Sequence, residues 1–170
     1  MRLTPPSGIT VRKLKIKTTT NTISALALYP ETYSETASQP AQSPGVLWIH
    51  GGGYIYGMKE MVYMSRAVDL VRKYGAVVVS PGYRLAFRKP YPAALEDAVA
   101  CYKWLLSQGW FGSQIVLAGD SAGGGLAMCL TMYLRDYDMP LPAVKLPVSV
   151  IFKKVSNCTI VISLSFHQIN

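Results

Sequence analysis

The sequence is poor in charged residues, cysteine and histidine. Charged residues make up 15% of its 170 positions and hydrophobic ones 50%, which argues against a disordered chain and suits one globular domain with a sizeable core. The three cysteines, Cys101, Cys129 and Cys158, do not have the spacing of a zinc site. Cys101 and Cys129 fall inside predicted helices, where we expect buried free thiols in a reducing, cytoplasmic setting. No metal or other cofactor is expected.

No secretory signal or membrane span is expected either. The charged N-terminal residues are not followed by the apolar run of a signal peptide. The most apolar window, residues 115–134, has about the length of a membrane span, but it contains Asp120 and the consecutive glycines Gly123, Gly124 and Gly125. A central Asp is poorly tolerated in lipid, so we expect no stable membrane insertion.

The formal net charge of +8 is compatible with nucleic-acid binding. Five of the seventeen basic residues, however, lie in the first seventeen positions. There Lys13, Lys15 and Lys17 alternate with Leu14 and Ile16, as along a half-exposed strand. No nucleic-acid motif accompanies these lysines, so we expect a solvated face and no nucleic-acid partner.

Apolar runs and helical periodicities alternate along the chain. Continuous apolar runs bounded by glycine or proline are typical of strands buried on both faces of a parallel sheet, and apolar residues at helical spacing indicate the helices between them. The patterns predict strands over 9–18, 22–29, 46–49, 76–79 and 115–118, helices over 60–74, 92–109 and 122–135, and a surface loop over 31–44. This alternation predicts an α/β fold with a mostly parallel sheet flanked by helices.

The pentapeptide GDSAG at 119–123 matches the pattern G-x-S-x-G between a predicted strand and a predicted helix. That is the setting of a nucleophile elbow, with Ser121 as the nucleophile. Gly119 and Gly123 leave room for the strand and the helix to approach, and the helix N-terminus favours negative charge at the serine. A serine that only forms a turn is the alternative. Dinucleotide and phosphate loops are excluded because neither glycine cluster has their spacing.

A second glycine cluster, HGGG at 50–53, follows the strand predicted over 46–49. Consecutive glycines after a strand let backbone N–H groups point into a cavity. Ester cleavage passes through a tetrahedral oxyanion, which two or three such donors stabilise. We expect Gly52, Gly53 and Ala122 to supply them.

The sequence resembles a known family in three segments: HGGGYIYG at 50–57, YRLAFRKPYPAALEDA at 83–98 and GDSAGGGLA at 119–127. Their order is that of the hormone-sensitive-lipase-like branch of the α/β-hydrolases. The resemblance implies a carboxylic ester hydrolase, with Ser121 as the nucleophile, the glycine-loop N–H groups as oxyanion donors and a small-molecule ester as substrate. The family usually continues Tyr-Arg-Leu-Ala with Pro-Glu, where this chain has Phe87 and Arg88.

The triad base and acid are not identified. In α/β-hydrolases the acid and then the histidine follow the nucleophile along the chain. His50 precedes it, and we expect His50 to orient the glycine loop rather than to act as the base. No acid lies beyond Asp138, and His167 matches no family motif.

The resemblance ends near residue 143. We expect residues 1–143 to form the N-terminal part of an α/β-hydrolase domain that lacks its C-terminal part, and 144–170 to be a tail of non-family character, such as a retained intron or an alternative last exon. The strand predicted over 115–118 then has an open edge, which 148–152 or 159–164 would have to cover without a specified register. Such a chain is expected to be marginally stable.

Three functional interpretations remain open. The first is a serine ester hydrolase that is inactive or weak in this form. The second is a non-catalytic small-molecule binder, because the family also resembles plant hormone receptors that have lost the histidine base. The third is an unstable product without function. The oligomeric state is not indicated.

Overall fold

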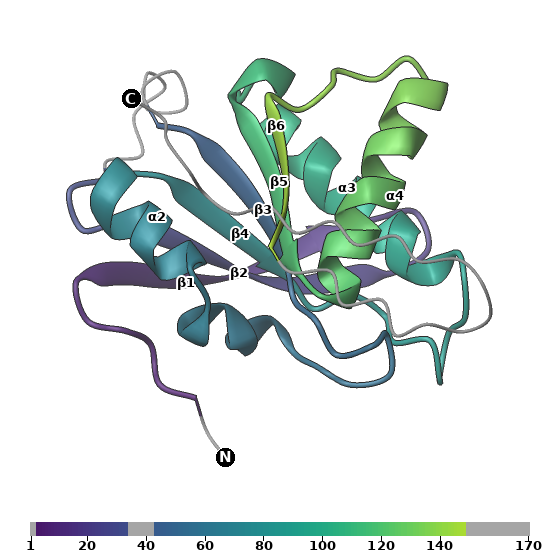
Figure 1. Ribbon diagram of the computed structural model, residues 1–170, viewed down its shortest axis with the longest axis horizontal. Coiled ribbons are helices and arrows are strands. Elements are labelled where there is room, and N and C mark those ends of the chain that lie inside the picture. Colours follow the sequence, from purple (N-terminus) through teal and green to yellow (C-terminus); the bar gives the residue numbers. More distant parts are fainter. Residues whose placement is uncertain (1–2, 34–42, 149–170) are drawn as a thin grey trace.

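The short apolar runs form the centre of a six-stranded sheet in the computed structural model, which describes residues 3–33 and 43–148 (Figure 1). The elements are β1 (Ile9–Lys17), β2 (Thr22–Pro30), β3 (Gly45–Ile49), the 3-10 helix η1 (Lys59–Met64), α2 (Ala67–Tyr74), β4 (Val77–Pro81), α3 (Ala93–Ser107), the 3-10 helix η2 (Gly112–Gln114), β5 (Ile115–Asp120), α4 (Ala122–Asp136) and β6 (Val144–Val148).

The strands lie in the order β1-β2-β4-β3-β5-β6. β4, β3, β5 and β6 run parallel to one another, and the antiparallel β1–β2 hairpin is joined to β4 through β2. The predicted α/β class with a mostly parallel sheet is therefore confirmed. Along β1 the expected alternation is present, since Lys15 and Lys17 are exposed and Ile16 is buried.

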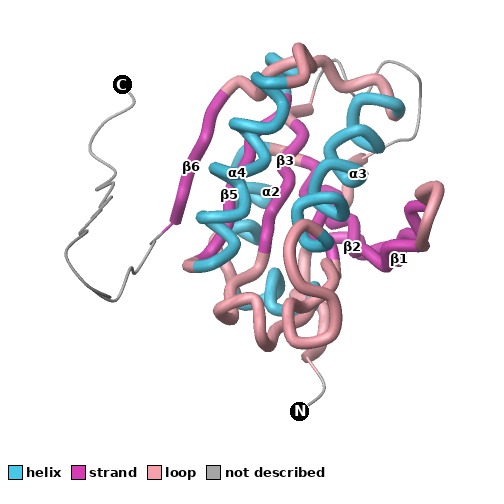
Figure 2. The backbone as a smooth tube through the Cα atoms, turned by 90° about the vertical axis from the view of Figure 1, so that its right-hand side faces the viewer, coloured by secondary structure: helices cyan, strands magenta, loops and turns pink. Residues whose placement is uncertain are grey.

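Helices cover both faces of the sheet, which is why its central strands are largely apolar. Figure 2 shows α3 and α4 in front of the sheet and α2 behind it. Successive side chains of a strand point to opposite faces. In β3, Leu47 and Ile49 accordingly belong to the core under α3 and α4, and Val46 and Trp48 to the core under α2.

The helix predicted over 60–74 is interrupted. η1 ends at Met64 and α2 begins at Ala67. Between them, the hydroxyl of Ser65 donates to the Val62 carbonyl and accepts from the Ala67 N–H. A serine that bonds to nearby backbone groups competes with continuous helix, which accounts for the break.

The expectation of an open edge at β5 is wrong for the described residues. β6 pairs with β5 in parallel, from Val116 opposite Val144 to Asp120 opposite Val148. The covering strand thus begins four residues earlier than the proposed patch at 148–152. The other candidate segment, 159–164, lies outside the described residues.

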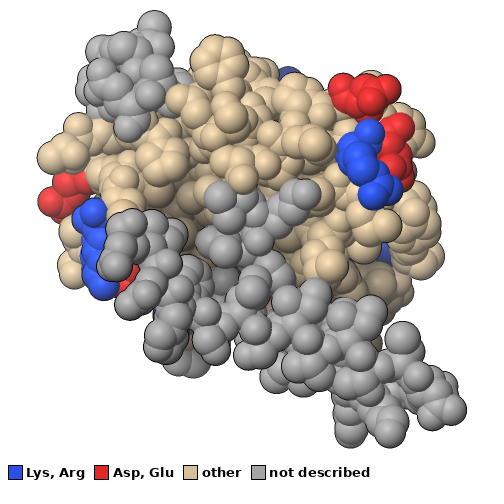
Figure 3. Space-filling view, turned by 45° about the horizontal axis from the view of Figure 1, so that its top comes forward, with Lys and Arg blue, Asp and Glu red and all other residues tan. Residues whose placement is uncertain are grey.

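The apolar window over 115–134 is divided between β5 and α4. In the part of the chain that the structure describes, no helix is both long and apolar enough to cross a bilayer. On the face seen in Figure 3, Lys, Arg, Asp and Glu side chains gather at two opposite margins, and other residue types make up most of the described surface between them.

The two described cysteines differ in exposure. Cys101 is buried as expected, but the prediction that Cys129 is buried is wrong, because Cys129 lies on the exposed side of α4. Cys158 lies outside the described residues.

Candidate active site

The carboxyl ends of β3 and β5 bring the two glycine motifs together. These strands are parallel neighbours, and Ile49 pairs with Gly119. The residues that follow each strand therefore leave the same edge of the sheet side by side. An ideal Cβ on Gly51 would lie 2.8 Å from the Asp120 carbonyl oxygen and 3.4 Å from the Ser121 Cβ, so the glycine loop lies directly against the serine turn.

Ser121 lies between β5 and α4 in a conformation that L residues rarely adopt. Its φ and ψ are 52° and −117°, and the residue is the N-cap of α4. Such strain is commonly found at functional sites. The helix N-terminus that begins here carries unpaired N–H groups and a partial positive charge, which stabilise negative charge next to the serine.

Gly119 and Gly123 are required on either side of the serine by close backbone approach. A Cβ on Gly119 would lie 2.5 Å from the Gly123 carbonyl carbon, and a Cβ on Gly123 would lie 2.1 Å from the Ile49 carbonyl oxygen. Both distances are shorter than any normal contact. The geometry confirms the strand–turn–helix setting and the role of the glycines as spacers.

The glycine loop is folded by its own hydrogen bonds. The Ile55 and Tyr56 N–H groups both donate to the Gly52 carbonyl, each at 3.1 Å. Gly52 has a φ of +115°, and a Cβ there would lie 1.9 Å from the Tyr56 carbonyl oxygen, so no other residue fits. Gly53 has a φ of +61° but open space around it, so only its backbone conformation favours glycine.

His50 is buried at the base of this loop. Its Nδ1 lies 2.8 Å from the Gly51 carbonyl oxygen, and its Nε2 is buried without a hydrogen-bond partner among the described residues. Burial lowers the pKa of His50, so the ring is neutral and its Nδ1–H donates to the Gly51 carbonyl. This geometry supports the predicted orienting role, which stays a prediction.

Two further residues of the site were not identified from the sequence. Tyr83 stacks on the His50 ring at 4.3 Å between ring centroids, and its hydroxyl donates to the His50 carbonyl at 3.0 Å. Asp120 accepts a hydrogen bond from Trp48 Nε1 at 3.1 Å, and burial raises the pKa of its carboxyl. Both residues lie inside the family-like motifs, but no local pattern indicates their partners, which lie in β3 or directly after it.

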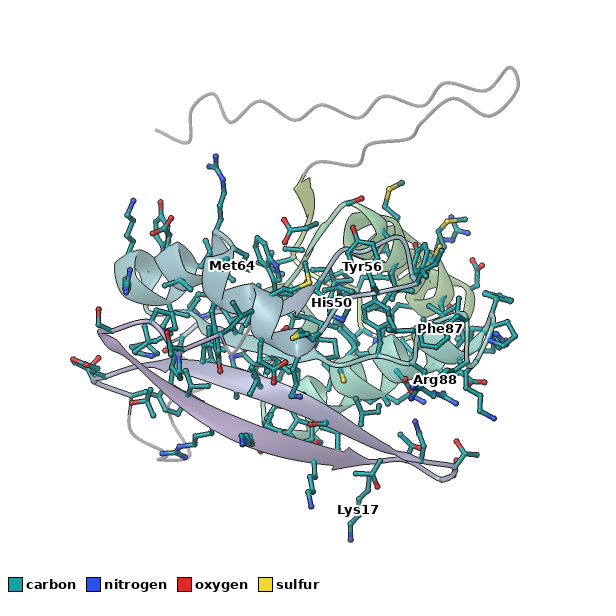
Figure 4. All side chains as sticks on the ribbon, turned by 90° about the horizontal axis from the view of Figure 1, so that it is seen from below. Lys17, His50, Tyr56, Met64, Phe87 and Arg88 are labelled. Atoms are coloured by element: carbon teal, nitrogen blue, oxygen red, sulfur yellow. The ribbon has the colours of Figure 1, made fainter. Side chains whose placement is uncertain are left out.

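Three large apolar side chains are exposed on the segments that follow β3 and β4. Tyr56, Met64 and Phe87 are 69%, 67% and 61% exposed, and Figure 4 labels them with His50. Arg88, beside them, lies 5.2 Å from the centroid of the Phe87 ring. A groove of about 1230 Å³ between the β1–β2 turn, α3 and α4 lies elsewhere, and its lining does not include Ser121.

A family model described as an alpha/beta hydrolase fold matches residues 46–156, well over half of the chain. The chain belongs to the α/β-hydrolases. The match continues past residue 143, after which a non-family tail is expected. That boundary remains a prediction.

Curated relatives and solved structures agree with this family. An acetyl-hydrolase of Streptomyces hygroscopicus is 43% identical over 114 residues, which are 65% of this chain and 38% of the relative. The hormone-sensitive lipase of Bos taurus is 32% identical over 116 residues, 64% of this chain and 15% of the relative. The crystal structure of an esterase from the bacterial hormone-sensitive lipase family matches with a TM-score of 0.66 and 34% identity, over 82% of this chain and 43% of that one.

These matches show the hormone-sensitive-lipase-like branch of the α/β-hydrolases, as the three motifs imply. The chain spans less than half the length of each of these relatives.

Proposed function

We propose that the chain carries the nucleophile and the oxyanion hole of a carboxylic ester hydrolase that acts on small-molecule esters. The observation that carries this proposal is the placement of Ser121, in its strained positive-φ conformation at the N-terminus of α4, against the Gly51–Gly53 loop. The names of the relatives, which are hydrolases and esterases, support the same reaction class.

In the proposed reaction the Ser121 Oγ attacks the acyl carbon of the ester, and its proton passes to a base. The carbonyl π electrons move onto oxygen, where the N–H groups of Gly52, Gly53 and Ala122 stabilise the negative charge. Collapse of this intermediate expels the alcohol, which takes up a proton. Water then attacks the acyl-serine by the same route and releases the acid.

The described residues do not include a histidine that is free to act as the base for Ser121. His50 is the one histidine in residues 3–33 and 43–148, and its Nδ1 is bonded within its own loop. The other histidine, His167, lies outside the described residues. A serine without a positioned base is a poor nucleophile at neutral pH. Binding and an oxyanion hole alone leave about 10³–10⁴-fold over the uncatalysed rate, so we expect a turnover far below the ~10 s⁻¹ of ordinary enzymes.

The lack of a positioned base among the described residues favours a second candidate function, a non-catalytic binder of small molecules. A binder with a structural serine does not react with a serine-directed phosphonate, whereas a hydrolase does.

The test compares labelling by such a phosphonate, and hydrolysis of a short nitrophenyl ester, in the wild type and three variants. Ser121→Ala is expected to abolish both while leaving the circular dichroism unchanged. Ser113→Ala, an exposed serine in η2, is the matched control and is expected to change neither. Labelling that persists in Ser121→Ala would exclude Ser121 as the nucleophile. Ordinary turnover that vanishes in His167→Ala would show that His167 is the missing base.

A further inference from the structure

The segment Tyr83–Ala86, between β4 and α3, lies against the glycine loop at two points. At one end, the Tyr83 ring stacks on His50 with an interplanar angle of 14°, and its hydroxyl donates to the His50 carbonyl. At the other end, the Ala86 N–H donates to the Tyr54 carbonyl at 2.8 Å. The segment therefore contacts the glycine loop both at its first residue and just beyond its last glycine.

Arg84, inside this segment, is fastened to helix α3. Its backbone N–H donates to Asp97 Oδ2 at 2.8 Å, and its Nε lies 3.1 and 3.0 Å from the two carboxylate oxygens. Asp97 is 1% exposed and also accepts from Asn21 Nδ2 at 3.1 Å. A buried carboxylate with this many donors holds both the side chain and the backbone of Arg84 in one place.

We propose that Tyr83 is a positioning residue for the oxyanion donors: the Arg84–Asp97 ion pair fixes the Tyr83–Ala86 segment, and Tyr83 in turn holds the glycine loop through His50. This inference rests on the proposed function, because it assigns to Tyr83 the placement of donors that act only if Ser121 attacks an ester.

The protonation states explain why Tyr83 carries this role. Burial raises the pKa of Tyr83, so its hydroxyl remains a donor. The hydrogen bond from His50 Nδ1 stays within the glycine loop, and Nε2 has no partner among the residues described. The ring stack and the hydroxyl of Tyr83 thus tie the His50 residue to the segment that follows β4. The His50 carbonyl that accepts this bond would also lie 2.6 Å from a Cβ on Gly123, next to the first turn of α4.

The chain offers a matched control for removing the Tyr83 hydroxyl. Tyr102 is equally buried, and its hydroxyl donates to a backbone carbonyl, that of Pro140, at 2.8 Å. Pro140 follows the C-terminal end of α4, whereas Ser121 lies at the N-terminus of this helix of 15 residues, about 22 Å long. Tyr83→Phe and Tyr102→Phe therefore remove the same kind of bond near the site and far from it.

The first measurement is the rate of phosphonate labelling of Ser121 at increasing reagent concentration. Tyr83→Phe is expected to lower the limiting rate about threefold to tenfold, the range that one net hydrogen bond supports, with an unchanged half-saturating concentration. Tyr102→Phe is expected to change neither value. Equal effects of the two variants on the limiting rate would overturn the proposal while leaving the assignment of Ser121 intact.

The second measurement does not depend on reactivity. Amide hydrogen exchange of the peptide containing residues 50–57 is expected to be at least about threefold faster in Tyr83→Phe than in the wild type, and unchanged in Tyr102→Phe. Exchange in this peptide that is no faster in Tyr83→Phe than in Tyr102→Phe would overturn the positioning role even if Ser121 does not label. If the wild type does not label, and exchange is faster in Tyr83→Phe alone, the proposed function is refuted. The conclusion that Tyr83 holds the glycine loop would still stand.

Discussion

Two glycines in the first turns of α4 are expected to respond in opposite ways to the same substitution. At Gly123 the added methyl would lie 2.1 Å from the Ile49 carbonyl oxygen and 2.6 Å from that of His50. A carbon normally stays at least about 3.3 Å from such an oxygen, so the helix and the end of β3 would have to separate by roughly 1 Å. Both obstacles are backbone atoms, at the last residue of β3 and the residue after it, and rotamer changes do not relieve contacts with backbone.

At Gly125, two residues further along the helix, the added methyl meets only the Tyr54 hydroxyl, at 3.0 Å. That hydroxyl is the end of a side chain that can move aside. Alanine is also favoured over glycine in a helix by about 0.8–1 kcal/mol. Gly125→Ala is therefore expected to leave the free energy of unfolding unchanged or to raise it by up to about 1 kcal/mol.

Gly123→Ala, in contrast, is expected to lower the free energy of unfolding by about 3 kcal/mol, the upper end of the usual cost of overpacking. Urea unfolding followed by tryptophan fluorescence, to which the buried Trp48 and Trp110 contribute, and by circular dichroism measures both variants against the wild type. A value for Gly123→Ala within about 0.5 kcal/mol of the wild type would refute the close approach of α4 to β3.

Three further predictions concern the glycine loop, the ion pairs of Arg84 and the pH dependence of stability. Gly52→Ala is expected to reduce the rate of phosphonate labelling on the order of 10²–10³-fold, because the added methyl distorts the donor loop. Gly53 has open space around it, so Gly53→Ala is expected only to lower the stability of the fold by the ~1–2 kcal/mol that a left-handed conformation costs an L residue. Similar labelling rates in both variants would contradict the oxyanion geometry. Asp97→Ala is expected to destabilise the fold by about 3 kcal/mol in urea unfolding, because Asp97 is buried with several donors. Glu96→Ala is expected to destabilise it by less than about 0.5 kcal/mol, because the Glu96 side chain is 57% exposed. Equal losses of stability would show that burial does not decide the strength of the two ion pairs of Arg84. Burial lowers the pKa of His50, so below pH ~6.5 the unfolded chain binds a proton at this residue that the folded chain does not. The stability that the neutral ring contributes is fully present above that pH, and the free energy of unfolding is expected to fall by up to ~1.4 kcal/mol per pH unit as the pH drops below it. In a His167→Ala background this slope is expected to vanish with His50→Gln, and a slope that persists would show that other groups cause it.

Much of the fold follows from local patterns. The alternation in β1, the apolar runs of β3, β4 and β5 and the helical spacing in α3 and α4 all match the described elements to within a few residues. These patterns are informative because a strand buried on both faces requires an apolar side chain at every position, whereas a helix requires one every third or fourth. The Ser121 turn was predictable for a similar reason, since the close approach of strand and helix excludes any side chain at Gly119 and Gly123.

The sequence motifs also indicated which residues belong to the candidate site, but not how the site is held. Ser121 and the glycine loop were found because each has a local signature. The stacking of Tyr83 on His50 and the bond from Trp48 to Asp120 join residues 33 and 72 positions apart, and no spacing along the chain predicts them.

Only the tertiary structure decided two other features. Cys129 lies on the exposed side of α4, and β6 covers the edge of β5. The sequence by itself determined which segments are strands and helices and where the serine turn lies, because these depend on the side chains of one segment and their period. The pairing of β6 and the contacts that position the glycine loop depend on the surfaces of segments distant in sequence, and so only the folded chain determines them.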